Sequence, residues 1–174
     1  SGAVGLGGAG FPTHVKLAYD RSKVKIDYLL LNGAECEPYI TSDYRELIEN
    51  SDNVLAGIDL VMTKLEIPKA IIGIEADKPQ AIAKLEKLAI RYPNISVQRL
   101  PSAYPQGAEK VLVHTLTGRI VGEGKLPSDV GCMVMNVSTA GFIYGYVKTG
   151  VPLVKRRITV DGDIVNSPTN FFIP

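Results

Sequence analysis

Between residues 26 and 100, short apolar runs alternate with longer segments of mixed polarity. The runs at residues 26–31, 70–75 and 95–100 have the length of buried strands. The segments at residues 53–65 and 79–92 carry apolar side chains at the spacing of a helix. This alternation is typical of a parallel sheet whose right-handed crossovers are helices. The chain is therefore predicted to have an α/β fold built on a parallel sheet.

The rest of the chain extends this pattern and then changes it. We expect a helix near residues 108–116, a short strand at 132–136 and a helix at 138–148. From Pro152 onward, polar and apolar residues alternate as in a half-buried strand. We place a domain boundary near Gly150, between an α/β ligand-binding domain at residues 1–150 and the beginning of a second domain at residues 151–174. Since the chain opens in a glycine-rich loop and closes on an apolar tail, we expect a fragment of a longer polypeptide.

The composition argues against several classes of protein. The 174 residues carry a formal net charge of +1, without the basic excess of a nucleic-acid-binding domain. The longest apolar runs are much shorter than the ~20 residues of a membrane-spanning helix, and we see no signal peptide. Cys36 and Cys132 are expected to be free thiols in a reducing compartment, and they are too few to hold a metal cluster alone. No arrangement of Ser, His and Asp indicates a hydrolase.

A glycine-rich loop at residues 5–10 precedes an expected short helix. Successive glycines let backbone amides approach an anion closely, and a helix start adds a favourable dipole. Lys16, about one turn into that helix, can supply a full positive charge. The loop therefore suits the phosphate or ribityl chain of a mononucleotide. Gly5, Gly7 and Gly10 also fit the dinucleotide fingerprint, but that fingerprint needs a preceding strand, and only four residues precede Gly5 in this sequence. A loop that serves only tight packing is the alternative.

The segment Asn32–Tyr39 follows the first predicted strand. Ligands of open α/β sheets bind beside the carboxyl ends of the strands. We expect Asn-Gly to open a polar loop here, in which Asn32 offers a donor and an acceptor to the edge of a flavin ring. Glu35 and Glu37 would point the same way in an extended loop and could bind ribose hydroxyls or act as acid and base. A solvated acidic turn is the simpler alternative.

Two further turns are expected at the same edge of the sheet. Tyr104–Lys110 enters a helix after the third strand, where Gly107 permits close approach and Tyr104 can cover an aromatic ring. Asn136–Ala140 joins a short strand to a helix whose first backbone amides could bind phosphate. A Pro-Gly type of turn and an ordinary helix cap are the alternatives at these two places.

The order of the four segments, Gly5–Lys16, Asn32–Tyr39, Tyr104–Lys110 and Asn136–Ala140, resembles the C subunit of the Rnf electron-transport complex. It is similar, more distantly, to the flavoprotein subunit that takes in NADH in respiratory complex I. The resemblance spans essentially the whole chain, and the first two segments are its most specific part. It implies a Rossmann-like flavin-binding domain at residues 1–150, followed by the start of a soluble-ligand-binding β-grasp (SLBB) domain at residues 151–174.

The resemblance also implies a function. NADH would reduce FMN, and the electrons would pass to iron–sulfur centres in a membrane complex that translocates ions, an NADH:ferredoxin oxidoreductase. Hydride transfer needs no catalytic side chain, because the cofactor carries the chemistry. The 4Fe-4S clusters would lie in a further domain outside this chain. The implied partners are NADH and the other subunits of the Rnf complex, not nucleic acid, with peripheral association at the cytoplasmic face of the inner or plasma membrane.

Two sets of site residues are implied by the resemblance. FMN would be bound by Gly5, Gly7, Gly8, Lys16, Asn32, Tyr104, Gly107, Glu109, Asn136 and Thr139. NADH would stack over the flavin, with Phe11, Glu35 and Glu37 near the nucleotide.

Two positions depart from the pattern of the complex I relative. Ala34 stands in place of an acid, so one flavin or nucleotide contact is lost, and Leu126 stands near the place of an aromatic clamp on the adenine. The cysteine-rich motifs of the full-length Rnf protein are also not found in this chain. A cobalamin-reductase flavoprotein of bacterial microcompartments shares the same core and is one alternative. A flavin-binding fragment without turnover is another.

Overall fold

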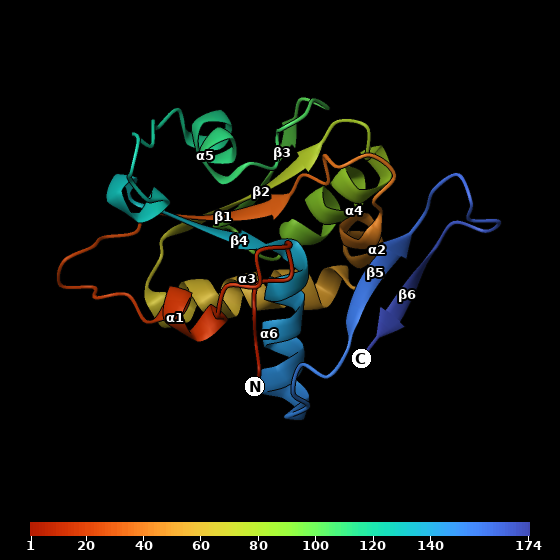
Figure 1. The fold of residues 1–174 in the computed structure, drawn as a ribbon. Helices are drawn as coiled ribbons and strands as arrows, with labels where there is room; N and C mark the ends of the chain where they lie inside the picture. The colour runs from red at the N-terminus through yellow and green to blue at the C-terminus, as the bar shows by residue number, and fades with distance from the viewer.

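A four-stranded parallel sheet in the order β3-β2-β1-β4 forms the centre of the molecule (Figure 1). Its strands are β1 (Tyr28–Gly33), β2 (Lys69–Glu75), β3 (Ile95–Leu100) and β4 (Cys132–Asn136). The structure is a computed structural model, and it describes residues 1–174. The predicted α/β fold with a parallel sheet is confirmed.

Helices cover both faces of this sheet. One face is covered by α2 (Ser42–Glu49), α3 (Ser51–Leu65), α4 (Pro79–Ala89) and α6 (Val137–Thr149), with the short α1 (Thr13–Leu17) at its margin. The other face is covered by α5 (Glu109–Thr117) and the 3-10 turn η1 (Pro127–Val130). In Figure 1, α5 lies above the sheet, while α3 and α6 lie below it.

The double cover explains the apolar run in β1. Leu29 and Leu31 point into the larger core with α2, α3, α4 and α6, whereas Leu30 points into the smaller core with α5. All three side chains are completely buried. A strand that is buried on both faces typically has a continuous run of apolar residues, as residues 29–31 have.

The end of β1 differs from the prediction. Asn32 and Gly33 were expected to open a loop, but they continue the strand and pair with Gly73 and Ile74 of β2. Asn32 also pairs with Asn136 of β4. Because neighbouring strands supply partners for the backbone on either side, the ladder outweighs the turn preference of Asn-Gly, and the loop begins at Ala34.

The last part of the chain forms a hairpin of β5 (Arg156–Val160) and β6 (Thr169–Ile173), which pair antiparallel. The hairpin packs beside α2, where the hydroxyl of Thr159 accepts a hydrogen bond from the backbone N–H of Thr41 at 3.0 Å. The strand pattern expected after Pro152 is therefore present. None of the helices combines the length and the apolar character that a bilayer span requires.

Candidate functional site

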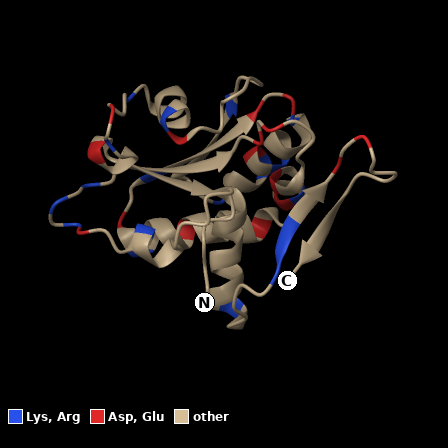
Figure 2. Ribbon diagram, in the orientation of Figure 1, with Lys and Arg blue, Asp and Glu red and all other residues tan.

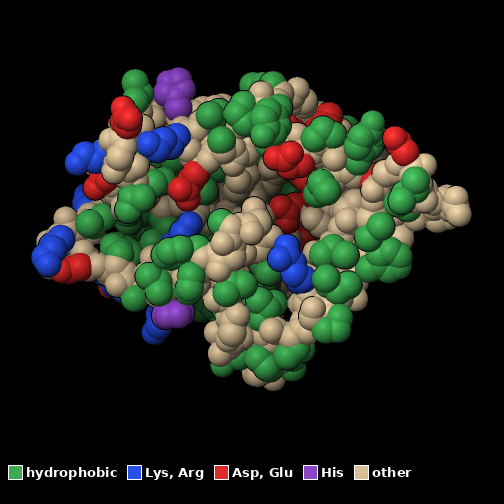
Figure 3. Space-filling view, viewed as in Figure 1, with side chains coloured by type: hydrophobic (Ala, Val, Ile, Leu, Met, Phe, Trp, Pro, Cys, Tyr) green, Lys and Arg blue, Asp and Glu red, His purple; other side chains and the backbone are tan.

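The strand order creates a crevice at the carboxyl ends of β1 and β4. From β1 the chain proceeds to β2 and β3 on one side, and then it returns to β4 on the other side of β1. Crossovers diverge at such a switch point, and ligands of open α/β sheets bind there. A cavity of about 400 Å³ lies at this place, within the usual size range of small-molecule sites. On the face shown in Figure 3, acidic side chains gather around a hollow near the middle of the molecule.

The cavity brings together most of the residues that the sequence assigned to the site. Its lining includes Gly7, Gly8, Asn32, Glu35, Glu37, Tyr104, Gly107 and Asn136. The other assigned residues, Gly5, Phe11, Lys16, Glu109 and Thr139, do not line it but belong to the segments that shape it.

The glycine loop is held at its base and open at its tip. The backbone N–H of Gly5 donates to the carbonyl of Phe11 at 2.8 Å, and that of Leu6 donates to the hydroxyl of Thr139 at 2.9 Å. The backbone amides of Gly7 and Gly8, which line the cavity, donate no hydrogen bond within the chain. The loop therefore presents free donors to a ligand. The expected help from a helix dipole is small, because α1 has only 5 residues.

Asn136 caps the first turn of α6. Its side-chain oxygen accepts hydrogen bonds from the backbone N–H groups of Ser138 at 2.9 Å and Thr139 at 3.2 Å. These amides, which could have bound phosphate, are thus already satisfied, and the alternative of an ordinary helix cap holds here. The nitrogen of the same carboxamide donates to Asp43 at 2.6 Å.

Asp43 is a site residue that the sequence did not indicate. Its carboxylate accepts hydrogen bonds from the Ser138 hydroxyl and from Asn136, each at 2.6 Å. The pKa of Asp43 is raised to about 6, chiefly because the carboxyl group is buried. The hydrogen bonds from Ser138 and Asn136 oppose this shift, and the neighbouring charges of Glu35 and Glu46 contribute to it. Buried carboxylates are normally paired with hydrogen-bond donors. This rule identifies Asp43 only after α2 has been placed over the end of the sheet, because the sequence alone does not show that Asp43 is buried.

Asn32 joins the first strand to the turn before α5. Its side-chain nitrogen donates to the carbonyl of Gly107 at 2.9 Å, and its oxygen accepts from the backbone N–H of Ala34 at 3.1 Å. The backbone N–H of Gly107 donates in turn to the sulfur of Cys36 at 3.3 Å. A side chain at Gly107 would meet the Ala34 carbonyl at 2.9 Å, so this glycine permits close packing against the protein backbone. The close approach of a ligand to Gly107 stays a prediction.

Glu35 and Glu37 have different environments. The carboxylate of Glu35 accepts from the backbone N–H groups of Asp43 at 2.8 Å and Tyr44 at 3.1 Å, and thereby caps α2. Glu37 is exposed and makes no hydrogen bond through its side chain within the chain. The two side chains line the same cavity, but Glu35 is engaged in holding the loop to α2.

Lys16 and Glu109 lie side by side, and neither is part of the cavity lining. The ammonium group of Lys16 donates to the carbonyl of Val134 at 2.9 Å and is 3.4 Å from the Glu109 carboxylate. These bonds connect α1 to the middle of β4 and to the first turn of α5. Lys16 therefore has partners within the chain, and its side chain is not part of the cavity lining.

A second cavity of about 480 Å³ lies between α6 and the hairpin. Leu6, Ser42, Asp43 and Arg156 line both cavities, so the two adjoin each other. Arg156 is the second residue that the sequence did not indicate. It comes from the hairpin, and no motif in the sequence marks it.

The chain is similar to a family of flavin-binding domains and to several known proteins. The model of the family described as the Nuo51 FMN-binding domain matches residues 1–145. The C subunit of a proton-translocating ferredoxin:NAD(+) oxidoreductase complex from Clostridium ljungdahlii is 49% identical over 173 residues, which are 99% of this chain and 37% of the relative. The C subunit of the Na(+)-translocating complex from Acetobacterium woodii is 46% identical over 168 residues, which are 97% of this chain and 38% of the relative. The chain thus spans somewhat more than a third of the length of these relatives.

Solved structures share the fold. The crystal structure of an NAD+-reducing [NiFe]-hydrogenase in the H2-reduced state matches with a TM-score of 0.83 and 25% identity, over 99% of this chain and 35% of that chain. The air-oxidized state of such a hydrogenase matches with a TM-score of 0.79 over the same shares of the two chains. The sheet and the hairpin are therefore arranged as in a known protein that reduces NAD+.

Proposed function

The chain belongs to the Nuo51 FMN-binding domain family, which has a Rossmann-like flavin domain, and from this premise we propose that it binds FMN in the cavity at the carboxyl ends of β1 and β4 and receives electrons from NADH there. One observation carries the proposal. The tip of the glycine loop presents the unpaired amides of Gly7 and Gly8 to a cavity of about 400 Å³ at the switch point of the sheet.

The residues of the cavity fit a flat mononucleotide. Backbone amides of Gly7 and Gly8 suit its oxygen atoms, and the exposed ring of Tyr104 at the mouth suits an aromatic face. Asn32 and Asn136 offer carboxamides on adjacent strands, both already oriented by hydrogen bonds within the chain. We propose that these residues and Gly107 hold FMN, while Gly5, Lys16, Glu109 and Thr139 hold the loop and the helix starts in place.

NADH would approach from the open side of the same cavity. Phe11 directly follows the glycine loop and is half exposed, so its ring is available to stack on a nucleotide ring. Glu37 is exposed and free, so it suits a ribose hydroxyl, whereas Glu35 would act by holding the loop. When bound, FMN supplies the chemistry of hydride acceptance and one-electron release, and the protein orients it and limits the access of water.

The names of the relatives support a role in a larger assembly. The relatives are named as the C subunits of ferredoxin:NAD(+) oxidoreductase complexes that translocate ions. We propose that this chain is the NADH-oxidising flavin part of such an Rnf-type protein. Iron–sulfur centres outside residues 1–174 would receive the electrons, and partner subunits would carry out ion translocation and attach the chain to the cytoplasmic face of the membrane.

Reconstitution with FMN tests the proposal. The purified chain, incubated with FMN and desalted, should retain the absorbance of a bound flavin at micromolar protein. Under anaerobic conditions, NADH should then bleach that absorbance. No retention of flavin would contradict the proposed site, and retention without bleaching would contradict the role of NADH.

A further inference from the structure

The proposed FMN cavity has an acidic lining, although its ligand is an anion. Glu35, Glu37 and Asp43 all line it. Glu35 is partly compensated by backbone N–H groups of α2, and Asp43 by hydrogen bonds from Asn136 and Ser138. Neither compensation supplies a positive charge to a phosphate. A site for a nucleotide at this place needs a cation, and the following inference rests on the proposed function.

Lys16 does not meet this need. Its ammonium group is bound to the carbonyl of Val134 and lies beside Glu109, and Lys16 is not part of the cavity lining. Lys16 would have to leave both partners to reach a ligand.

Arg156 is the one lysine or arginine in the cavity lining. It is exposed, and its guanidinium group makes no hydrogen bond or ion pair within the chain. The next residue, Arg157, shows the contrast, because its guanidinium group lies 2.6 Å from the Glu49 carboxylate on α2. In Figure 2 the basic start of β5 lies beside acidic positions of α2. The chain thus anchors one arginine of the pair and leaves the other free at the cavity.

Arg156 also lies where the two cavities meet. A ligand that fills the cavity at the sheet end and extends toward α6 must pass it. A guanidinium group can bind two oxygens of a phosphate at once, with charge-assisted hydrogen bonds. We propose that Arg156 binds a phosphate group of the nucleotide at this site, and so links the hairpin to the ligand. The proposed function brings two such phosphates to the site, that of FMN and the pyrophosphate of the nicotinamide dinucleotide.

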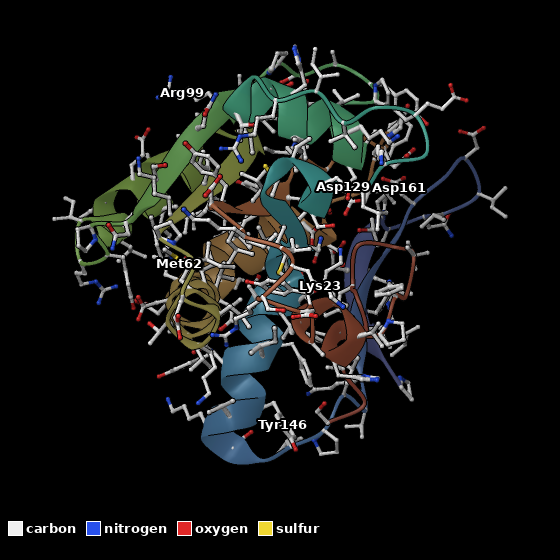
Figure 4. The ribbon with its side chains drawn as sticks, turned by 90° about the vertical axis from the view of Figure 1, so that its left-hand side faces the viewer. Lys23, Met62, Arg99, Asp129, Tyr146 and Asp161 are labelled. Carbon is white, nitrogen blue, oxygen red and sulfur yellow. The ribbon has the colours of Figure 1, made fainter.

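Binding measurements on the chain with FMN and with riboflavin, which lacks the phosphate, test the proposal. Arg156→Ala should weaken FMN binding roughly ten- to a hundredfold, as expected for the loss of a charge-assisted hydrogen bond, and should leave riboflavin binding unchanged. Arg156→Lys keeps the charge without the planar fork and should lie between the two. Arg99→Ala is the matched control, because Arg99 is an exposed strand arginine on β3, on the opposite side of the molecule from the hairpin that carries Asp161 (Figure 4).

Three outcomes decide the inference. A loss confined to FMN assigns the contact to the flavin phosphate. Unchanged FMN binding, with a tenfold or larger loss of NAD+ binding by the FMN-loaded chain in calorimetry, assigns it to the dinucleotide. The proposal is overturned if Arg156→Ala matches Arg99→Ala for both ligands, or if FMN and riboflavin weaken equally, since the arginine would then act on the fold. Wild-type chain that binds no FMN would contradict the proposed function itself, separately from the role of Arg156.

Discussion

At the scale of single residues, Asp43 connects three parts of the site. It lies on α2, accepts hydrogen bonds from the cap of α6, and lines both cavities. Because Asn136 uses its oxygen to cap α6 and its nitrogen to bind Asp43, the carboxylate determines which way the carboxamide is turned. The cost of this arrangement is the burial of a charge near Glu35 and Glu46.

The burial of the Asp43 carboxyl group predicts that the free energy of unfolding depends on pH. Folding raises the pKa of Asp43 from 3.8 to about 6, so the folded chain binds this proton more tightly than the unfolded chain. The resulting stabilisation is complete below about pH 4 and is lost as the pH rises through about 6. Each pKa unit corresponds to about 1.4 kcal/mol. In Asp43→Asn, which has no such proton to lose, the free energy of unfolding relative to wild type should improve by up to about 3 kcal/mol between pH 4 and pH 7.

Urea unfolding at several pH values measures this difference. Asp59→Asn is the control, because Asp59 is exposed on α3 and makes no hydrogen bond through its side chain. A difference between Asp43→Asn and wild type that stays constant from pH 4 to pH 7 would show that Asp43 does not titrate in this range.

Only those site residues that belong to recognisable sequence motifs could be predicted from the sequence. The glycine loop, Asn32 and the turn at Gly107 could be predicted because their residue types have special backbone or hydrogen-bonding properties. Asp43 and Arg156 could not, since an aspartate on a helix and an arginine on a strand are ordinary surface residues until the tertiary structure brings them to the cavity. Lys16 was assigned to the ligand, but the structure shows its bonds to Val134 and Glu109, so its contact with FMN stays a prediction.

At the scale of the elements, the closest packing is between α3 and α6. Gly57 on α3 faces the backbone of Ala140 on α6, and an added methyl group at Gly57 would lie only 1.9 Å from the Ala140 carbonyl oxygen. Since α6 begins at the cap made by Asn136, this contact also sets the position of one wall of the site.

Gly57→Ala should therefore destabilise the chain. The helices must move apart, and overpacking of this kind costs about 1–3 kcal/mol. Gly145→Ala is the matched control, because a methyl group on that glycine of α6 would meet nothing within 4 Å. That change should stabilise the chain by about 0.5–1 kcal/mol through helix propensity. Denaturant unfolding measures both values, and equal effects of the two substitutions would contradict the packing argument.

Most helices and strands could be predicted from the sequence, because the spacing of apolar residues indicates which face of each element is buried. The runs at residues 70–75 and 95–100 became β2 and β3 in a buried sheet. The end of β1 was not predictable from local preference, since Asn32 and Gly33 form a favourable turn dipeptide and only strand pairing on both sides shows that they are extended. Local sequence does not contain the partner strands, which lie about 40 and 100 residues away along the chain.

At the scale of the whole molecule, the hairpin is attached to the sheet domain by polar contacts. Arg157 is largely buried and contacts Glu49 at 2.6 Å, with Glu46 at 3.9 Å and the ring of Phe172 below its guanidinium group. The hydroxyl of Thr41 accepts a hydrogen bond from Asn170 of β6 at 2.9 Å. The domain boundary near Gly150 stays a prediction. If the boundary is real, the hairpin can open locally while the sheet stays folded.

Arg157→Ala tests this independence. The substitution leaves Glu46, which is largely buried, without a cation, and removing one partner of such a pair is costly because the remaining charge stays desolvated. We expect the backbone amides of β5 and β6 to exchange hydrogen at least tenfold faster, while those of β1 and β2 keep their protection, since local opening needs less free energy than global unfolding. Lys155→Ala is the control, because Lys155 is exposed and has no carboxylate partner. If protection falls equally in the sheet and the hairpin, the two form one cooperative unit. A boundary near Gly150 would then be wrong, and ligand contacts from the hairpin would be part of a single folding domain.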